Sequence, residues 1–125
     1  MKARILLADD HEIVRKGIRS LLDGQFPWEV CGEADNGREA VDKVLSLRPD
    51  LVILDLSMPL LNGIEAAREI RRLAPATKIV IFSMHDSARI AEEARNAGAD
   101  AYLAKTAHFN DLQKTIAGLL GESTT

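Results

Sequence analysis

The sequence predicts a single α/β domain with a central parallel sheet and helices on both of its faces, the doubly wound arrangement. Short apolar segments alternate strictly with segments of helical spacing, which gives five strand–helix units along 125 residues. Such alternation favours parallel strands joined by right-handed crossovers. The apolar run at 51–54 (LVIL) has no polar position, as expected of a strand covered on both faces. The length suits one domain with its own core.

The first two strand–helix units precede this central run. Residues 4–8 (RILLA) are apolar and bounded by charge, which indicates a buried strand, and residues 11–23 have helical spacing. Residues 28–34 (WEVCGEA) alternate only partly, which favours a strand nearer an edge. A turn at 35–37 precedes the second helix, which Pro49 ends. The residues expected to face the core are Val14, Ile18, Leu21 and Leu22 in the first helix and Ala40, Val41, Val44 and Leu45 in the second.

The rest of the chain repeats this alternation. We expect strands at 51–54, 78–82 and 100–104, each followed by a helix, at 63–73, 87–97 and 108–120 respectively. The expected inward positions are Ile64, Ala67, Ile70 and Leu73 in the helix at 63–73, and Phe109, Leu112, Ile116 and Leu119 in the helix at 108–120. A polar tail, GESTT, follows.

Composition and charge exclude several classes of protein. A net charge of −3 gives no general affinity for nucleic acid or anionic membrane. No apolar run approaches the roughly 20 residues that span a bilayer, and the N-terminus lacks the apolar segment of a signal peptide. The single cysteine, Cys31, cannot form an internal disulfide and is expected to be a small buried residue. The histidines at 11, 85 and 108 are dispersed and predict no metal set. We therefore expect a cytoplasmic protein.

Five polar residues lie at the ends of four expected strands. Asp9 and Asp10 follow the first strand, and Asp55, Ser83 and Lys105 follow the third, fourth and fifth. Because parallel strands direct their carboxyl ends to one edge of the sheet, these side chains are expected to meet there. An aspartate after a strand is by itself more often a turn or helix-capping residue. The combination is far more specific than any of its members.

Three carboxylates and one ammonium favour magnesium and phosphoryl chemistry. Hard oxygen ligands suit Mg²⁺, and the mutual repulsion of Asp9 and Asp10 raises the affinity of such a site for a cation. Asp55 is the candidate nucleophile that forms an acyl phosphate. Lys105 offers a point charge to a phosphoryl group, and Ser83 offers a hydrogen-bond donor.

Most of the chain, residues 3–120, resembles the receiver domain of two-component response regulators. The matching segments are ADDHEIVRKGIRSLL, DLVILDLSMPLLNGIEAAREIR, VIFSMHD and GADAYLAKTA. The first and last of these resemble the NarL/FixJ subfamily, whose members usually carry a C-terminal helix-turn-helix for DNA. The resemblance implies a flavodoxin-like (βα)5 receiver fold with strand order 2-1-3-4-5. It places the domain at 1–120, with 121–125 as a tail or the start of a linker.

The resemblance also implies a metal set around a phosphoacceptor. Asp55 matches the phosphoacceptor and a ligand of Mg²⁺ (or Mn²⁺). Asp10 matches a direct ligand, Asp9 a ligand acting through water, and Ser57 a ligand through its main-chain carbonyl. Asp10→Asn is therefore expected to weaken Mg²⁺ binding severely.

Further positions match phosphoryl-binding and switching roles. Lys105, Ser83 and the main-chain N–H of Met84 match groups that bind the phosphoryl. Ser83 and Tyr102 match the switch pair, although a tyrosine in a strand also has an ordinary packing role. Ser57 and His85 match positions that tune phosphoryl lifetime, and Pro59 and Gly63 match the shaped loop after the acceptor. Many receivers have a cis proline after the lysine; Thr106 stands there, and a cis bond without proline costs about 2.5–4 kcal/mol, so none is expected.

The implied function is regulatory rather than enzymatic. A sensor histidine kinase would phosphorylate Asp55, and the domain would promote its own phosphoryl transfer and slow dephosphorylation. The face formed by the fourth helix, fifth strand and fifth helix would then change its affinity for partners or for an output domain. The implied partners are the kinase, a C-terminal DNA-binding effector absent from this chain and a phosphorylation-linked homodimer. No membrane and no direct nucleic-acid contact are expected.

Three other interpretations are open. A Mg²⁺-dependent phosphatase or phosphotransferase would need a substrate pocket, and the chain has no long insertion to supply one. A receiver-fold module that binds partners without phosphorylation would need none of Asp10, Asp55, Ser83 and Lys105. A flavodoxin-like cofactor binder would need a phosphate-cradling glycine loop after the first strand, where ADDHE places negative charge instead.

Overall fold

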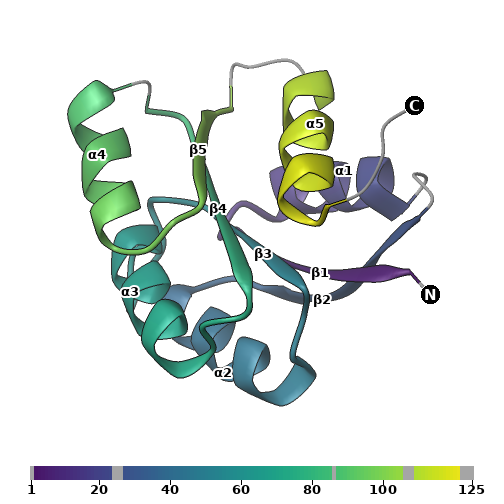
Figure 1. The fold of residues 1–125 in the computed structure, drawn as a ribbon, viewed down its shortest axis with the longest axis horizontal. Coiled ribbons are helices and arrows are strands. Elements are labelled where there is room, and N and C mark those ends of the chain that lie inside the picture. Colours follow the sequence, from purple (N-terminus) through teal and green to yellow (C-terminus); the bar gives the residue numbers. More distant parts are fainter. Residues whose placement is uncertain (1, 24–26, 86, 106–108, 122–125) are drawn as a thin grey trace.

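A computed structural model describes residues 2–23, 27–85, 87–105 and 109–121 (Figure 1). Its five-stranded parallel sheet has the order β2-β1-β3-β4-β5, which confirms the predicted fold class and strand order. The elements are β1 (Ala3–Ala8), α1 (Glu12–Asp23), β2 (Trp28–Ala34), α2 (Gly37–Leu47), β3 (Leu51–Leu54), α3 (Gly63–Leu73), β4 (Lys78–Ser83), α4 (Ala88–Asn96), β5 (Ala101–Ala104) and α5 (Phe109–Leu119). Within these described segments, no helix has the length and apolar character needed to cross a membrane.

Helices cover the sheet from both sides. α1 and α5 lie against one face, and α2, α3 and α4 against the other (Figure 1). The alternating side chains of β1 divide between the two layers, because Ile5 and Leu7 join the cluster beneath α1 and α5 while Leu6 and Ala8 join the opposite cluster. All four residues of β3 are buried, as predicted for the central strand.

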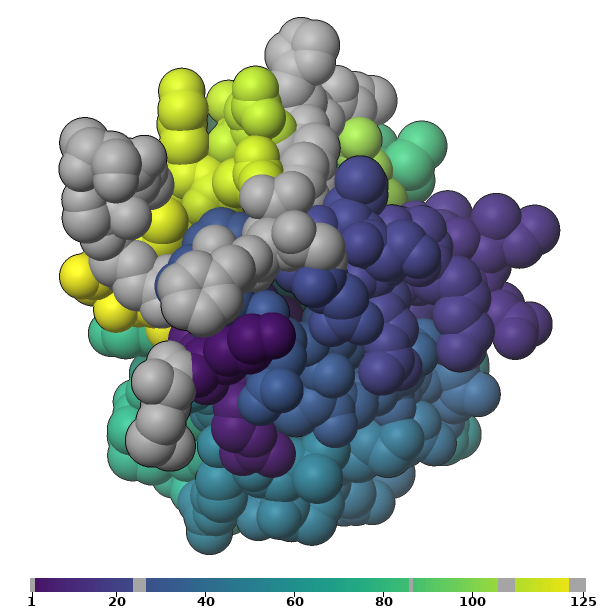
Figure 2. Space-filling model, turned by 90° about the vertical axis from the view of Figure 1, so that its right-hand side faces the viewer, coloured from purple at the N-terminus to yellow at the C-terminus, as the bar shows by residue number. Residues whose placement is uncertain are grey.

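The predicted edge position of β2 is also confirmed. Figure 2 views the molecule toward this side, where the purple-to-blue N-terminal elements fill most of the surface. The register against β1 shifts between Ile5 and Leu6, whose partners are Val30 and Gly32, so Cys31 is an extra residue on the edge strand. Cys31 is half-buried rather than buried, because the bulge lies on the open side of the sheet.

Two helices bury fewer residues than their spacing predicts. Ile18 and Leu22 of α1 are buried, but Val14 is 39% and Leu21 49% exposed, so the prediction that they face the core was wrong. α1 contacts mainly β1 and the edge strand β2, so its flanks extend past the sheet. Leu73 is 37% exposed because it ends α3, and the following Ala74 is buried in its place.

The other predicted inward positions divide between buried and half-buried residues. Buried are Ala40, Val41, Val44, Ala67, Ile70, Leu112 and Ile116. Half-buried against the clusters are Leu45, Ile64 and Leu119. The side chain of Phe109 lies outside the described set.

The loop from β3 to α3 is fixed tightly against the end of β3. The Asn62 side chain caps α3 by accepting the Glu65 N–H, and Glu65 accepts the Asn62 N–H in return, a capping box. The Gly63 N–H donates to the Leu56 carbonyl at 2.8 Å. A Cβ at Gly63 would lie 2.4 Å from the Asp55 carbonyl oxygen, so only glycine lets α3 begin this close to the strand. The start of α3 and the position of Asp55 are thereby coupled.

Candidate functional site

The expected convergence at the carboxyl edge of the sheet is observed. Asp9 follows β1, Asp55 follows β3, Ser83 ends β4 and Lys105 follows β5, and these four strands are neighbours in the sheet. Backbone bonds align the strand ends, since the Asp55 N–H donates to the Ala8 carbonyl at 2.9 Å and the Lys105 N–H donates to the Ser83 carbonyl at 2.6 Å. The site is therefore built on the sheet itself.

Lys105 joins two buried carboxylates. Its Nζ lies 2.6 Å from Asp9 Oδ2 and 3.2 Å from Asp55 Oδ1, across 96 positions of sequence in the first case. The side chains of Lys105, Asp9 and Asp55 are only 7%, 3% and 4% exposed. Water screens such a buried cluster poorly, so its charges interact strongly.

Asp55 carries a charge that its neighbours compensate incompletely. Burial raises the pKa of its carboxyl, the adjacent Asp9 charge raises it further, and Lys105 acts in the opposite direction. Its Oδ2 is buried and has no hydrogen-bond partner among the described residues. A buried unpaired carboxylate oxygen is costly, and such a group in a native fold calls for a cation or a reacting partner.

A metal-binding group adjoins this orphaned oxygen. Single ligand atoms of Asp9, Asp10, His11 and Asp55 all lie within 4.8 Å of one another. Asp10 is more exposed than Asp9 and Asp55, as suits a ligand at the mouth of the site. The carboxylate oxygens fit a hard divalent ion. His11 adjoins the three aspartates in this group, although the sequence predicted no set of histidine ligands, and its position directly after the acidic pair was the available signal.

Ser83 and Tyr102 both hold the backbone of His85. The Ser83 hydroxyl, 1% exposed, accepts the His85 N–H at 3.0 Å, and the half-buried Tyr102 donates its hydroxyl to the His85 carbonyl. These two residues come from β4 and β5, so the loop before α4 is fixed from both strands. Met84, which stands between Ser83 and His85 in the sequence, is 66% exposed at the surface. Thr106 lies outside the described residues.

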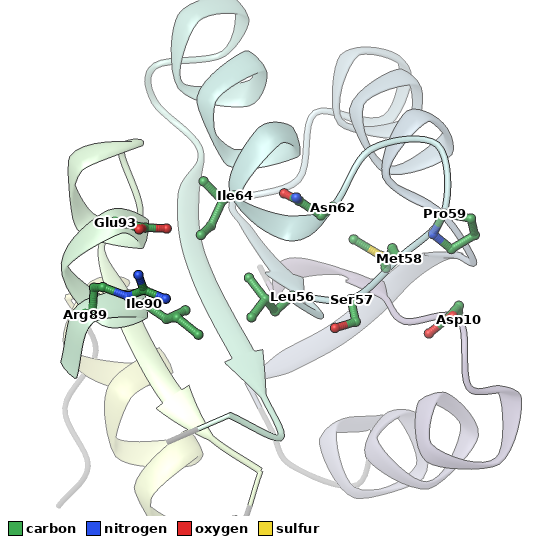
Figure 3. Close-up of a pocket in the computed structure, with 10 residues that line it drawn as sticks. All are labelled: Asp10, Leu56, Ser57, Met58, Pro59, Asn62, Ile64, Arg89, Ile90 and Glu93. Carbon is green, nitrogen blue, oxygen red and sulfur yellow. The ribbon is translucent and has the colours of Figure 1, made fainter. Parts of the chain in front are cut away.

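A groove of about 670 Å³ extends from the site along the surface (Figure 3). Asp10, Ser57 and Pro59 lie at one end, and Arg89 and Glu93 of α4 lie at the other. The predicted carbonyl ligand Ser57 is thus placed beside Asp10. The groove gives reagents an open approach to Asp10 and Ser57.

The fold and this carboxylate–lysine arrangement are those of a receiver domain of two-component signalling. The chain belongs to the response regulator receiver domain family, whose model matches residues 5–117. It is therefore a regulatory domain of a two-component system.

Similar proteins come from several bacteria. The response regulator VraR of Staphylococcus aureus strain COL is 36% identical over 116 residues, 93% of this chain and 56% of that protein. A LuxR-family response regulator from Aurantimonas sp. SI85-9A1 is 39% identical with a TM-score of 0.92, over 97% of this chain and 86% of that one.

A third similar structure is RcsB of Salmonella enterica serovar Typhimurium, solved bound to the promoter rprA with the phosphomimetic BeF₃⁻. It is 28% identical with a TM-score of 0.86, over 94% of this chain and 98% of that one. The chain spans about half the length of the curated relatives it matches.

Proposed function

We propose that Asp55 accepts a phosphoryl group from the phosphohistidine of a sensor kinase, with a divalent ion, in our assignment Mg²⁺, bound beside it. The orphaned Asp55 Oδ2 carries this proposal. It is a buried carboxylate oxygen without a hydrogen-bond donor among the described residues, and Lys105 contacts the other oxygen of the same carboxylate. Asp10, Asp55 and the Ser57 carbonyl would hold the ion directly, and Asp9 would hold it through water. When bound, Mg²⁺ would neutralise charge on the phosphoryl oxygens.

The reaction exchanges one phosphorus bond for another. An Asp55 oxygen attacks the phosphorus, the P–N bond to the donor imidazole breaks, and the imidazole leaves with a proton from solvent. Lys105 is already in contact with Asp55, so it is placed to neutralise the new phosphoryl oxygens without further movement. The Met84 N–H is assigned as a second donor.

Output is proposed to follow from a change of partner at Ser83. Its hydroxyl now accepts the His85 N–H, and in the phosphorylated form it would donate to the phosphoryl group instead. Tyr102, which holds the His85 carbonyl, would respond to the released loop and alter the face of α4, β5 and α5. Ser57 and His85 are assigned as the residues that tune phosphoryl lifetime.

The wider assignments are extensions of this proposal. We assign residues 1–120 to a cytoplasmic receiver domain and 121–125 to the start of a linker. The domain promotes its own phosphorylation and slow dephosphorylation but is not a turnover enzyme. Promoter binding by the similar RcsB supports a DNA-binding output, which we assign to a C-terminal effector. A phosphorylation-linked homodimer is a further part of the proposal.

Intact mass tests the proposal directly. The parent and Asp55→Asn are incubated with Mg²⁺ and acetyl phosphate, with and without EDTA. The parent is expected to gain one phosphoryl group, about 80 Da, that is absent from Asp55→Asn and from the EDTA sample. If neither acetyl phosphate nor a phosphorylated kinase domain labels the parent, a phosphorylation-independent binding module replaces the phosphoacceptor.

A further inference from the structure

His11 lies at the metal site with a nitrogen aimed into it. Its Nδ1 is 3.1 Å from Asp10 Oδ1, 3.1 Å from Asp9 Oδ1 and 4.0 Å from Asp55 Oδ2. The Asp9 side chain already makes other hydrogen bonds, whereas Asp55 Oδ2 is buried and has no hydrogen-bond partner among the described residues. The nitrogen and an orphaned oxygen thus face the same point.

The distances fit an octahedral ion. With metal–ligand bonds of about 2.1 Å, neighbouring ligands lie about 3.0 Å apart and opposite ligands about 4.2 Å apart. Nδ1 and Asp10 Oδ1 have the neighbouring separation, and Nδ1 and Asp55 Oδ2 are close to the opposite one. Both separations from Nδ1 are therefore those that ligands of one ion would have, and all the candidate ligand atoms lie within 4.8 Å of one another.

Asp9 is less suited to direct ligation than His11. Its Oδ2 accepts from Lys105 at 2.6 Å, and its Oδ1 accepts the His11 backbone N–H at 2.8 Å. The His11 carbonyl in turn accepts the Arg15 N–H at 2.9 Å, so the His11 backbone is anchored on both sides. Its side chain, 62% exposed, lies at the mouth of the site and can bind an ion without moving a strand.

We propose that His11 Nδ1 is a direct ligand of the divalent ion, together with Asp10 and Asp55, and that it turns the site toward borderline transition-metal dications such as Co²⁺ and Ni²⁺. This inference rests on the proposed metal site. Carboxylates and carbonyls suit Mg²⁺, whereas an imidazole adds affinity for later first-row metals. A site with only oxygen ligands would lack that added preference.

Pulsed electron paramagnetic resonance of bound Mn²⁺ tests the ligand directly. The parent is expected to show hyperfine coupling to ¹⁴N, which changes to ¹⁵N coupling when only histidine is labelled with ¹⁵N. The coupling is expected to vanish in His11→Asn. It is expected to persist in His85→Gln, because the described contacts of His85 are made by its backbone.

Calorimetric titrations test the preference. His11→Asn is expected to lose at least about tenfold in Ni²⁺ affinity, because losing a group that only supports a metal ligand already lowers metal affinity by that factor. The Mg²⁺ affinity of the variant is expected to change far less. Bound Mn²⁺ without histidine coupling, or coupling retained in His11→Asn, would overturn the role of His11 and leave the phosphoacceptor proposal standing. Failure of the parent to bind any of these ions would overturn both.

Discussion

At the scale of single residues, the site is short of positive charge. Lys105 contacts Asp9 and Asp55, while Asp10 lies in the same group of ligand atoms. One ammonium cannot balance three carboxylates, and two of the three are almost fully buried. The fold therefore retains an electrostatic cost that a bound dication would relieve.

Asp55→Asn is expected to stabilise the metal-free protein at neutral pH. Because burial and Asp9 raise the folded-state pKa of Asp55, ionisation of this carboxyl lowers the free energy of unfolding as pH rises from the ordinary value of 3.8 through the raised one. The amide removes that charge, with a gain of about 1 kcal/mol or more at pH 7. Urea unfolding of the parent and of Asp55→Asn, in EDTA and at a series of pH values, measures this difference in the free energy of unfolding.

The matched control for that experiment is Asp42→Asn, an exposed aspartate of α2. It is expected to change the free energy of unfolding by less than about 0.5 kcal/mol. An Asp55→Asn protein that is less stable than the parent at pH 7 and equal to it in acid would contradict the inferred charge imbalance.

Glu33 makes the opposite contribution. Burial of this β2 residue raises its pKa, but hydrogen bonds from Arg19, Arg15 and Lys16 reverse that effect and lower the pKa to about 2. The side chain is only 12% exposed. A carboxyl with a lowered folded-state pKa adds stability that is present above its unfolded value of 4.5 and is lost as pH falls toward 2.

Glu33→Gln is therefore expected to destabilise the protein by about 2–3 kcal/mol at pH 7. The difference from the parent is expected to shrink steadily between pH 4.5 and 2, as the parent's carboxylate becomes protonated. Denaturant unfolding of both proteins across this range measures it. A difference independent of pH would show that the contribution of Glu33 comes from packing rather than from its charge.

At the scale of elements, the site depends on where strands end and helices begin. Gly63 begins α3 against the carbonyl of Asp55, and Gly37 begins α2 with its Cβ position 2.0 Å from the Leu61 carbonyl oxygen. The loop carrying Ser57 thus lies between two helix starts that tolerate no side chain. Close packing of this kind holds Asp55 in place without any contact to its carboxylate.

Gly63→Ala and Gly17→Ala form a matched pair. Alanine at Gly63 meets the Asp55 backbone and is expected to cost about 1–3 kcal/mol of stability and to slow phosphorylation. Alanine at Gly17, exposed within α1 with nothing within 4 Å, is expected to stabilise by about 0.5–1 kcal/mol. Thermal unfolding measures the stability of both variants, and the rate of phosphorylation by acetyl phosphate measures their reactivity. Equal effects in the two variants would contradict the coupling of α3 to Asp55.

Strand ends were predictable from the sequence and some helix faces were not. Apart from β2, each strand is a short, mainly apolar run that a polar residue ends or follows, so the positions of Asp55 and Lys105 follow from local pattern and parallel topology. The exposure of Val14 and Leu21 depends on how far α1 extends past the sheet. The spacing of apolar residues in the sequence gives no information on that position. The direction of the His11 ring depends on side-chain geometry in a single turn.

At the scale of the whole molecule, ligand binding and folding are linked. An ion that binds only the folded chain raises its stability, by about 2.7 kcal/mol at a hundredfold excess over Kd. Mg²⁺ is therefore expected to raise the Tm of the parent by several degrees. Asp10→Asn is expected to remove most of that rise, whereas Asp42→Asn keeps it. Differential scanning calorimetry at several Mg²⁺ concentrations measures the shift, and an unchanged shift in Asp10→Asn would remove Asp10 from the ligand set.

Site-resolved chemical trapping tests most directly whether Asp55 itself becomes the acyl phosphate. The phosphorylated parent is reduced with borohydride, which converts an aspartyl phosphate to homoserine, and its peptides are sequenced by mass spectrometry. Homoserine is expected at position 55 alone, and its formation is expected to depend on both the phosphodonor and the divalent ion. Homoserine at position 9 or 10, or a stable phosphate on Ser83 with Asp55 unmodified, would contradict that role of Asp55.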